Sequence, residues 1–94
     1  MSDDDMNKHV ILLSEPVNFA VVQLPERKFP GVVCQGDTLH SLVQELELML
    51  ISLKNRDFEG LESGIDLIRM QLLGAQSFYE SVCKAHEIDL PYPK

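Results

Sequence analysis

The stretch that decides the fold of this chain is residues 29–39, which read Phe-Pro-Gly-Val-Val-Cys-Gln-Gly-Asp-Thr-Leu. The apolar, β-branched run at residues 31–35 predicts a short strand. Gly36 can take the positive φ that ends a strand sharply. Asp37 or Thr38 can then cap a helix by accepting backbone N–H bonds from its first turn. The stretch therefore predicts a strand that passes directly into a helix.

Two further strands are predicted before this junction. Residues 9–13 (His-Val-Ile-Leu-Leu) and residues 19–24 (Phe-Ala-Val-Val-Gln-Leu) are short apolar runs, and turn-forming segments around Pro16 and Pro25 end them. Short connections favour antiparallel neighbours. The first third of the chain therefore predicts a meander of three strands.

A first helix is predicted from Leu39 to about Lys54, because apolar residues recur there at spacings of three and four. The members of this apolar row are Leu39, Leu42, Val43, Leu46, Met49, Leu50 and Leu53. Leu48 and Ile51 lie outside it, since each residue turns the helix by about 100°. They are either a second apolar patch covered by a partner or two scattered exposed side chains.

A second helix is predicted after Asp57, which is a good N-cap residue. Its apolar residues form an unbroken heptad seam of Phe58, Leu61, Ile65, Ile68, Leu72, Ala75, Tyr79 and Val82. The seam predicts a helix of nearly thirty residues, roughly 40 Å long, whereas the first helix spans roughly 25 Å. Part of the second helix must therefore be covered by the sheet or by a second copy of the chain.

One flank of the seam carries the small residues Gly60, Gly64 and Gly74. Glycine in a helix costs about 1 kcal/mol relative to alanine, so close approach of another element is expected as compensation. A kink at Gly74 is the alternative.

The length of 94 residues suits a single domain. Residues 1–7 are polar and are predicted to be a disordered N-terminal tail. Residues 8–94 are predicted to be one α+β domain, in which a three-stranded antiparallel sheet is followed by two helices, the second long with a heptad seam.

The chain is acidic, with 8 basic and 15 acidic side chains and a net charge of −7. Nucleic acid and anionic membranes are therefore excluded as partners, because phosphate binding needs clustered lysine and arginine. A basic protein surface is a better match, although the charge could serve solubility alone.

There is no signal peptide, no apolar run of membrane-spanning length and no close cysteine pair, so the protein is predicted to be cytoplasmic with reduced thiols at Cys34 and Cys83.

No catalytic arrangement is visible in the sequence. The three histidines, His9, His40 and His86, are scattered over different predicted elements. Cys34 could pair with His40, or Cys83 with His86, but a surface histidine beside a structural thiol is the simpler interpretation. No phosphate-binding glycine motif is present. The sequence therefore predicts a protein that is not an enzyme, with no catalytic residues, no cofactor and no metal.

The strand-to-helix junction resembles that of HicB-type antitoxins, in which a strand ending in a similar Pro-Gly and then Gly-Asp-Thr/Ser-Leu leads into the first helix. The resemblance covers about a tenth of the chain and implies a partial ferredoxin-like domain. It would make Val32 to Gln35 the third strand and Leu39 to Lys54 the first helix. In that family a further strand follows the first helix, whereas a long heptad helix is predicted here.

The chain as a whole is similar to a family of small uncharacterised bacterial proteins. The shared patterns are Leu-Leu-Ser-Glu-Pro at residues 12–16, Asn-Phe-Ala-Val-Val at residues 18–22 and Phe-Pro-Gly-Val-Val at residues 29–33. No activity is implied by this resemblance.

The acidic charge, the resemblance to antitoxins and the absence of a catalytic arrangement together favour a non-enzymatic inhibitor. It would be an immunity protein or antitoxin that neutralises a bacterial toxin by docking an acidic surface on a basic toxin domain. The residues predicted to bind the partner are Glu45, Glu47, Leu48, Ile51, Glu59, Glu62 and Asp66. The alternative is a self-associating structural or regulatory module that dimerises through the long C-terminal helix. The residues predicted for that dimer are Leu72, Ala75, Phe78, Tyr79 and Val82.

Overall fold

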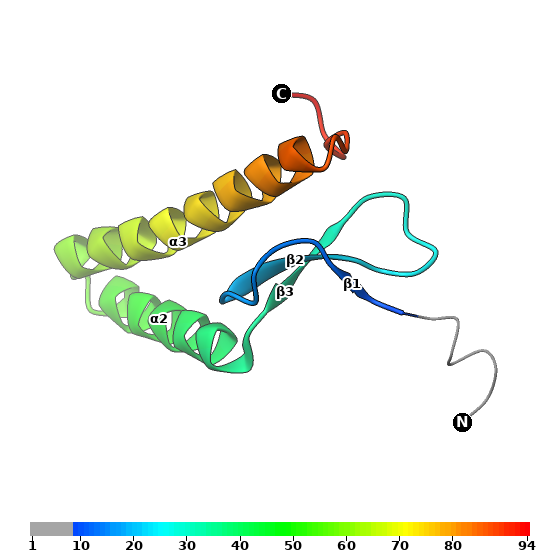
Figure 1. The fold of residues 1–94 in the computed structure, drawn as a ribbon. Coiled ribbons are helices and arrows are strands. Elements are labelled where there is room, and N and C mark those ends of the chain that lie inside the picture. Colours follow the sequence, from blue (N-terminus) through cyan, green and yellow to red (C-terminus); the bar gives the residue numbers. More distant parts are fainter. Residues whose placement is uncertain (1–8) are drawn as a thin grey trace. The chain divides into compact units, whose positions relative to one another are not determined.

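The protein is an α+β protein, as predicted, with a three-stranded antiparallel sheet followed by two helices, the second of them long (Figure 1). A computed structural model describes residues 9–94. In chain order the elements are β1 (Ile11–Leu12), β2 (Phe19–Gln23), β3 (Gly31–Cys34), α2 (Gly36–Lys54) and α3 (Phe58–Ala85). The predicted disordered tail at residues 1–7 lies outside the described residues.

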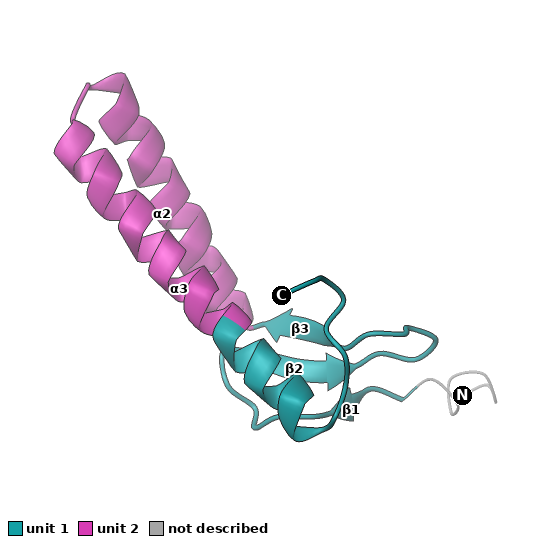
Figure 2. Ribbon diagram, turned by 90° about the horizontal axis from the view of Figure 1, so that it is seen from above, with its two compact units in different colours: residues 1–34, 77–94 teal, residues 35–76 magenta. Residues whose placement is uncertain are grey.

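The chain divides into two compact units, coloured teal and magenta in Figure 2. Unit 1 consists of the residues up to Cys34 together with Ser77–Lys94, so it contains the sheet and the last turns of α3. Unit 2 is Gln35–Gln76, which is α2 and the larger part of α3.

The sheet of unit 1 has the order β1-β2-β3, with β2 in the centre and antiparallel to both neighbours. β2 pairs residue for residue with β3, so that Val21 lies opposite Val32. β1 is shorter than predicted, with Ile11–Leu12 in place of residues 9–13, and Ser14 follows soon after it. Its hydroxyl accepts a hydrogen bond from the Val21 backbone N–H at 2.9 Å, in place of a strand carbonyl.

The core of unit 1 forms where the last turns of α3 meet the sheet. Val21 of β2 clusters with Tyr79, Val82 and Cys83 of α3, and Leu13, Phe78, Ile88 and Leu90 pack around them. The Tyr79 hydroxyl donates a hydrogen bond of 2.8 Å to the backbone carbonyl of Pro30. The part of the second helix that the first cannot cover is therefore covered by the sheet, one of the two predicted outcomes.

α3 ends in a Schellman motif, in which the residue after the helix takes the left-handed conformation. Glu87 holds that position with φ 55°. The backbone N–H of Ile88 donates to the Cys83 carbonyl at 2.8 Å, and that of Glu87 to the Lys84 carbonyl at 3.1 Å. These bonds satisfy carbonyls that the helix end would otherwise leave without donors.

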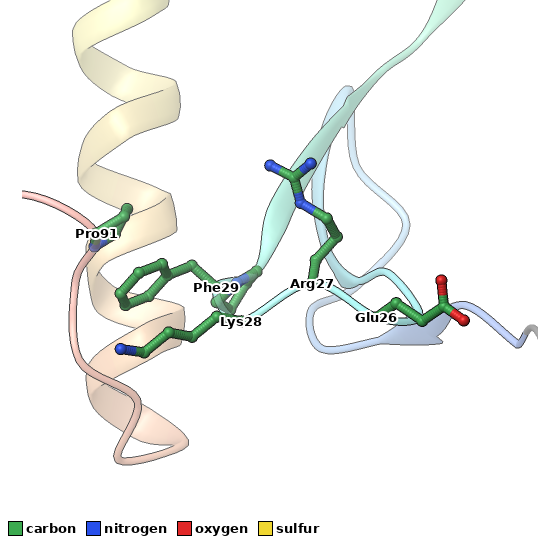
Figure 3. A pocket seen from close by; sticks show the side chains of 6 residues that line it. Glu26, Arg27, Lys28, Phe29 and Pro91 are labelled. Atoms are coloured by element: carbon green, nitrogen blue, oxygen red, sulfur yellow. The ribbon is translucent and has the colours of Figure 1, made fainter.

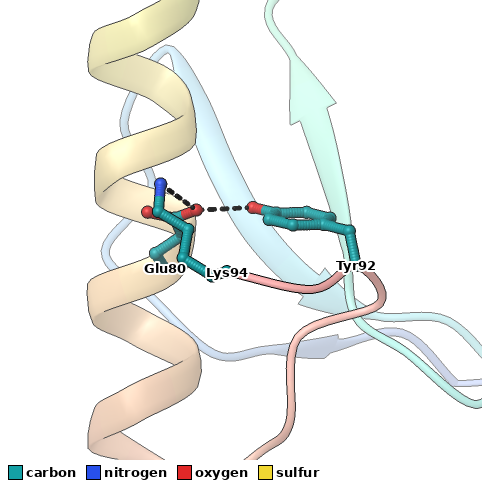
Figure 4. A network of polar contacts seen from close by, with 3 residues as sticks. All are labelled: Glu80, Tyr92 and Lys94. Atoms are coloured by element: carbon teal, nitrogen blue, oxygen red, sulfur yellow. Dashed lines mark hydrogen bonds and ion pairs between the residues drawn. The ribbon is translucent and has the colours of Figure 1, made fainter.

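The chain after α3 returns along that helix and is held there by Glu80 (Figure 4). The Tyr92 hydroxyl donates to Glu80 Oε2 at 2.9 Å, and the Lys94 ammonium lies 3.1 Å from the same oxygen. The bond from Lys94, and then that from Tyr92, lowers the pKa of the Glu80 carboxyl below its ordinary value.

Unit 2 is a hairpin of α2 and the first part of α3. α2 begins at Gly36, earlier than predicted, and two details of the predicted junction are wrong. Gly36 does not have a positive φ, and the N-cap is Gln35, whose side chain makes no capping bond. Since the backbone of Gln35 is already extended, with φ −61° and ψ 144°, the chain turns into the helix without a left-handed residue.

The two helices are joined by three residues that end one helix and begin the next. Arg56 takes the left-handed conformation with φ 56°, and the Asp57 N–H donates to the Ser52 carbonyl at 2.8 Å, which makes a second Schellman motif. The Asp57 carboxylate then accepts a bond of 3.0 Å from the Gly60 N–H. Asp57 is thus the N-cap of α3, as predicted.

Two glycines allow α2 and α3 to approach closely. A Cβ placed on Gly64 would lie 2.5 Å from Met49 Cγ and 2.9 Å from Glu45 Oε1, and one on Gly60 would clash with Asp57 and touch Ser52. Gly74 has open space around it. Close approach therefore accounts for Gly60 and Gly64 but not for Gly74.

We expect Gly74→Ala to raise the free energy of unfolding by about 1 kcal/mol, because alanine is the better helix former and nothing obstructs its methyl group. Gly64→Ala is the matched change, and it should destabilise by roughly 1 kcal/mol, since the methyl group must displace Met49. Urea unfolding followed by circular dichroism measures both. An equal gain at Gly64 would contradict the close packing of the two helices.

Candidate functional site

The helical hairpin carries a row of exposed apolar side chains on α2. The residues that face α3 are half-buried and recur three and four apart; they are Thr38, Leu42, Glu45, Met49 and Ser52. The predicted apolar row of α2 is split by this arrangement, because only Leu42 and Met49 turn toward α3. The remaining members, Leu39, Val43, Leu46, Leu50 and Leu53, are exposed. No residue of α2 is buried.

A second exposed row runs along α3. Phe58, Ile65 and Leu72 are spaced by seven and are exposed, with Phe58 at 62%. Leu61, Ile68 and Ala75, the intervening members of the heptad seam, are half-buried.

Both rows lie on the same side of the hairpin. Each member of the α2 row follows a half-buried residue by one position, as Leu50 follows Met49, and on α3 Ile65 follows the buried Gly64 by one position. One position is a turn of about 100°. On each helix the exposed row therefore lies about 100° from the side that faces the other helix, in the direction of increasing residue number. Because the two helices run antiparallel, this rotation brings both rows to the same side of the hairpin. We call the eight residues together the apolar face: Leu39, Val43, Leu46, Leu50, Leu53, Phe58, Ile65 and Leu72.

The residues predicted to bind a partner do not form one surface. Glu45 is half-buried and lies against Gly64. Helical rotation turns Glu47, Leu48 and Ile51 away from the apolar face, along a strip that we call the outer edge of α2. It turns Glu59, Glu62 and Asp66 away from α2, along the outer edge of α3, so the two groups do not share a surface. All six are exposed.

The outer edge of α2 combines apolar and acidic side chains. A shallow hollow of about 420 Å³ lies there, lined by Val43, Gln44, Glu47 and Leu48. Leu48 and Ile51 are more than half exposed. Unit 2 as a whole contains seven acidic and three basic residues. This edge is therefore an apolar patch in a negative field.

The residues predicted for a dimer are divided between the two units. Leu72 is exposed and Ala75 half-buried in unit 2, whereas Phe78, Tyr79 and Val82 belong to unit 1. Tyr79 and Val82 are buried in the core of unit 1, and Phe78 packs against it. Those three side chains therefore serve the fold of a single chain.

Unit 1 carries two open hollows. One, of about 540 Å³, lies beside the β2–β3 loop and is lined by Glu26, Arg27, Lys28, Phe29, Pro30 and Pro91 (Figure 3). The Lys28 ammonium lies 5.2 Å from the centre of the Phe29 ring, a cation–π distance. The other, of about 440 Å³, is lined by Leu13, Ser14, Glu15, Val17, Phe78 and Val82. Neither brings together a nucleophile, a base and an acid.

His86 and Cys83, near the end of α3, have surroundings that indicate a structural role and not a catalytic one. A ring nitrogen of His86 lies 2.9 Å from the Leu13 carbonyl oxygen. Cys83 is buried and Cys34 half-buried, as predicted for thiols outside disulfides. Within residues 9–94, no group of three or more histidine, cysteine, aspartate or glutamate side chains is placed to hold a metal ion.

The chain belongs to the Family of unknown function (DUF6959), whose model it matches over residues 5–92. This match fits the predicted membership of an uncharacterised family and gives no support to a relation with HicB-type antitoxins. Comparison with curated proteins and comparison with solved structures each gave no match. Within the described part of the chain, no helix is both long and apolar enough to cross a membrane.

Proposed function

We propose that this protein is a non-enzymatic binding protein that neutralises a bacterial toxin, as an immunity protein or antitoxin does, by docking an acidic surface on a basic region of the toxin. The observation that carries the proposal is the outer edge of α2, where exposed Leu48 and Ile51 lie beside Glu47 and a shallow hollow. Apolar anchors beside a carboxylate, on a hairpin with more acidic than basic residues, are suited to a partner of opposite charge.

The acidic edge of α3 and the thiols support the same proposal. The acidic edge of α3, with Glu59, Glu62 and Asp66, would attract a basic toxin over long range and speed its capture. The thiols of Cys34 and Cys83 suit a reducing cytoplasm, where an antitoxin or immunity protein meets its target. The junction between β3 and α2 adds its resemblance to HicB-type antitoxins as a motive for this class.

The test is rescue of growth. Each toxin candidate encoded beside this gene is expressed with and without the full chain, and rescue by the chain supports the proposal. Replacing Glu47 and Leu48 by lysine should weaken binding of the rescued toxin at least about tenfold, since like charges would then meet and an anchor is lost. Asp89→Lys, at an exposed position of unit 1, is the charge control and should leave binding within about twofold. The absence of rescue by any neighbouring toxin gene would overturn the proposal.

A self-associating module is the second candidate function. The observation that favours it is the apolar face of unit 2, whose eight large side chains are exposed in the single chain.

A further inference from the structure

The apolar face is the largest feature of unit 2 that the fold of one chain leaves unexplained. It contains eight large apolar side chains and no charged one, all of them exposed. On α2 its members are spaced 4, 3, 4 and 3, and on α3 they are spaced by seven. This is the 3.5-residue repeat by which helices pack side chains into one another over several turns. A contiguous apolar surface of this kind marks an interaction site.

We propose that the occupant of the apolar face is a second copy of this chain, and that two hairpins form an antiparallel four-helix bundle around a two-fold axis perpendicular to the helices. Each α2 then packs on the α2 of the other copy, and each α3 on the other α3. This inference does not depend on the proposed toxin-neutralising function, although the two surfaces share Val43, which lines the hollow on α2, and Glu62.

The first argument is that both rows are symmetric about one level of the hairpin. The row on α2 is centred at Leu46 and the row on α3 at Ile65. Gly64 of α3 touches Glu45 and Met49 of α2, so the two centres lie at nearly the same height. A single two-fold axis at that height sets Leu46 opposite Leu46 of the other copy and Phe58 opposite Leu72. It also sets Leu39 opposite Leu53, whereas Val43 and Leu50 are offset by one residue.

The second argument is charge complementarity along the flank of the α3 row. Glu62 and Arg69 lie on the outer flank of this row, three residues before and four residues after Ile65, so Glu62 of one copy would come close to Arg69 of the other, twice per dimer. Neither side chain has an ion-pair partner among the described residues of its own chain. An isologous interface requires this kind of self-complementarity, and an unrelated partner does not.

The primary experiment is light scattering of the full chain over a range of concentrations, with two matched variants. Leu46→Glu lies at the proposed axis and introduces two glutamates opposite each other, whereas Leu48→Glu lies two residues away on the outer edge. Their exposed fractions are similar, 53% and 57%. The wild type and Leu48→Glu should have twice the mass of the chain. Leu46→Glu should raise the dissociation constant at least about 100-fold. A wild type that stays monomeric at high concentration, or equal effects of the two variants, would overturn the proposal.

The orientation is tested by cross-linking. Ile65→Cys, with Cys34 replaced by alanine, should form a disulfide-linked dimer by itself on oxidation, because the axis brings the two copies of this position together. In a bundle whose axis runs along the helices, position 65 would meet position 46 of the other copy. Linking that requires a mixture of Ile65→Cys and Leu46→Cys would therefore contradict the proposed axis.

Exchanging the charges at positions 62 and 69 tests the dimer without altering the apolar face. Arg69→Glu should weaken dimerisation roughly tenfold, since Glu62 would then meet a glutamate, and Glu62→Arg combined with Arg69→Glu should restore it. Failure of the double variant to recover the dimer would show that these two residues do not meet.

Discussion

Val21→Asp is expected to unfold unit 1. Val21 is 0% exposed and lies at the centre of the only core cluster that joins β2 to α3 in the described structure. An aspartate there would be an unpaired charge without water, which costs several kcal/mol. Small domains have a total stability of only about 5–15 kcal/mol. We therefore expect a loss of at least about 4 kcal/mol in the free energy of unfolding.

Val32→Asp is the matched control, because Val32 is paired directly with Val21 across the sheet but is 45% exposed. Its aspartate can remain hydrated, so the loss should be about 1 kcal/mol or less. Urea unfolding gives both values, and amide NMR spectra show whether the signals of β2 and β3 collapse. Similar losses for the two variants would mean that this cluster does not hold the sheet on the helix.

The sequence predicted the elements of the fold correctly where a single physical pattern dominates. The heptad seam from Phe58 to Val82 required a long helix, and α3 spans 28 residues. Asp57 had both the side chain and the position of an N-cap, and it is one. The alternation of short apolar runs with prolines gave three antiparallel strands in the right order.

The helix ends were harder to predict, because the residues that occupy them are not the usual ones. Arg56 and Glu87 take the left-handed conformation that normally selects glycine or asparagine, so composition gave no signal of either Schellman motif. Gln35 caps α2 through backbone geometry alone. In each case the conformation depends on neighbouring hydrogen bonds, which the conformational propensities of single residues do not describe.

The candidate surface could be predicted only in part, because periodicity shows that residues share a face without showing what covers it. The seven apolar residues of α2 formed one row in the sequence, but close approach at Gly60 and Gly64 turns only Leu42 and Met49 toward α3. The same approach rotates Leu46 and Leu50 into solvent. The small residues on one flank of α3 were the available signal for this rotation.

Tyr79→Phe is expected to lower the free energy of unfolding by about 1–3 kcal/mol. The Tyr79 side chain is 6% exposed, and its hydroxyl donates to the Pro30 carbonyl at 2.8 Å. Phenylalanine keeps the ring in the core but leaves that carbonyl without its donor, which costs about the desolvation of one buried polar group. Tyr92→Phe is the control, since its bond to Glu80 is only partly buried and its loss should cost less. A loss at Tyr79 no larger than that at Tyr92 would show that the Pro30 bond contributes little.

The effect of Tyr79→Phe should depend on pH in a particular direction. Burial above all, and then the neighbouring Cys83 thiol, raises the pKa of Tyr79 from its ordinary 10.0 to about 12. The folded protein therefore favours the neutral phenol, and the resulting stability is complete below pH 10 and is lost as the pH rises to 12. The difference in stability between wild type and Tyr79→Phe should thus shrink as the pH rises from 10 to 12, while Tyr92→Phe follows the wild type. A difference that stays constant from neutral pH to pH 12 would mean that the Tyr79 hydroxyl ionises as readily in the folded chain as in the unfolded one.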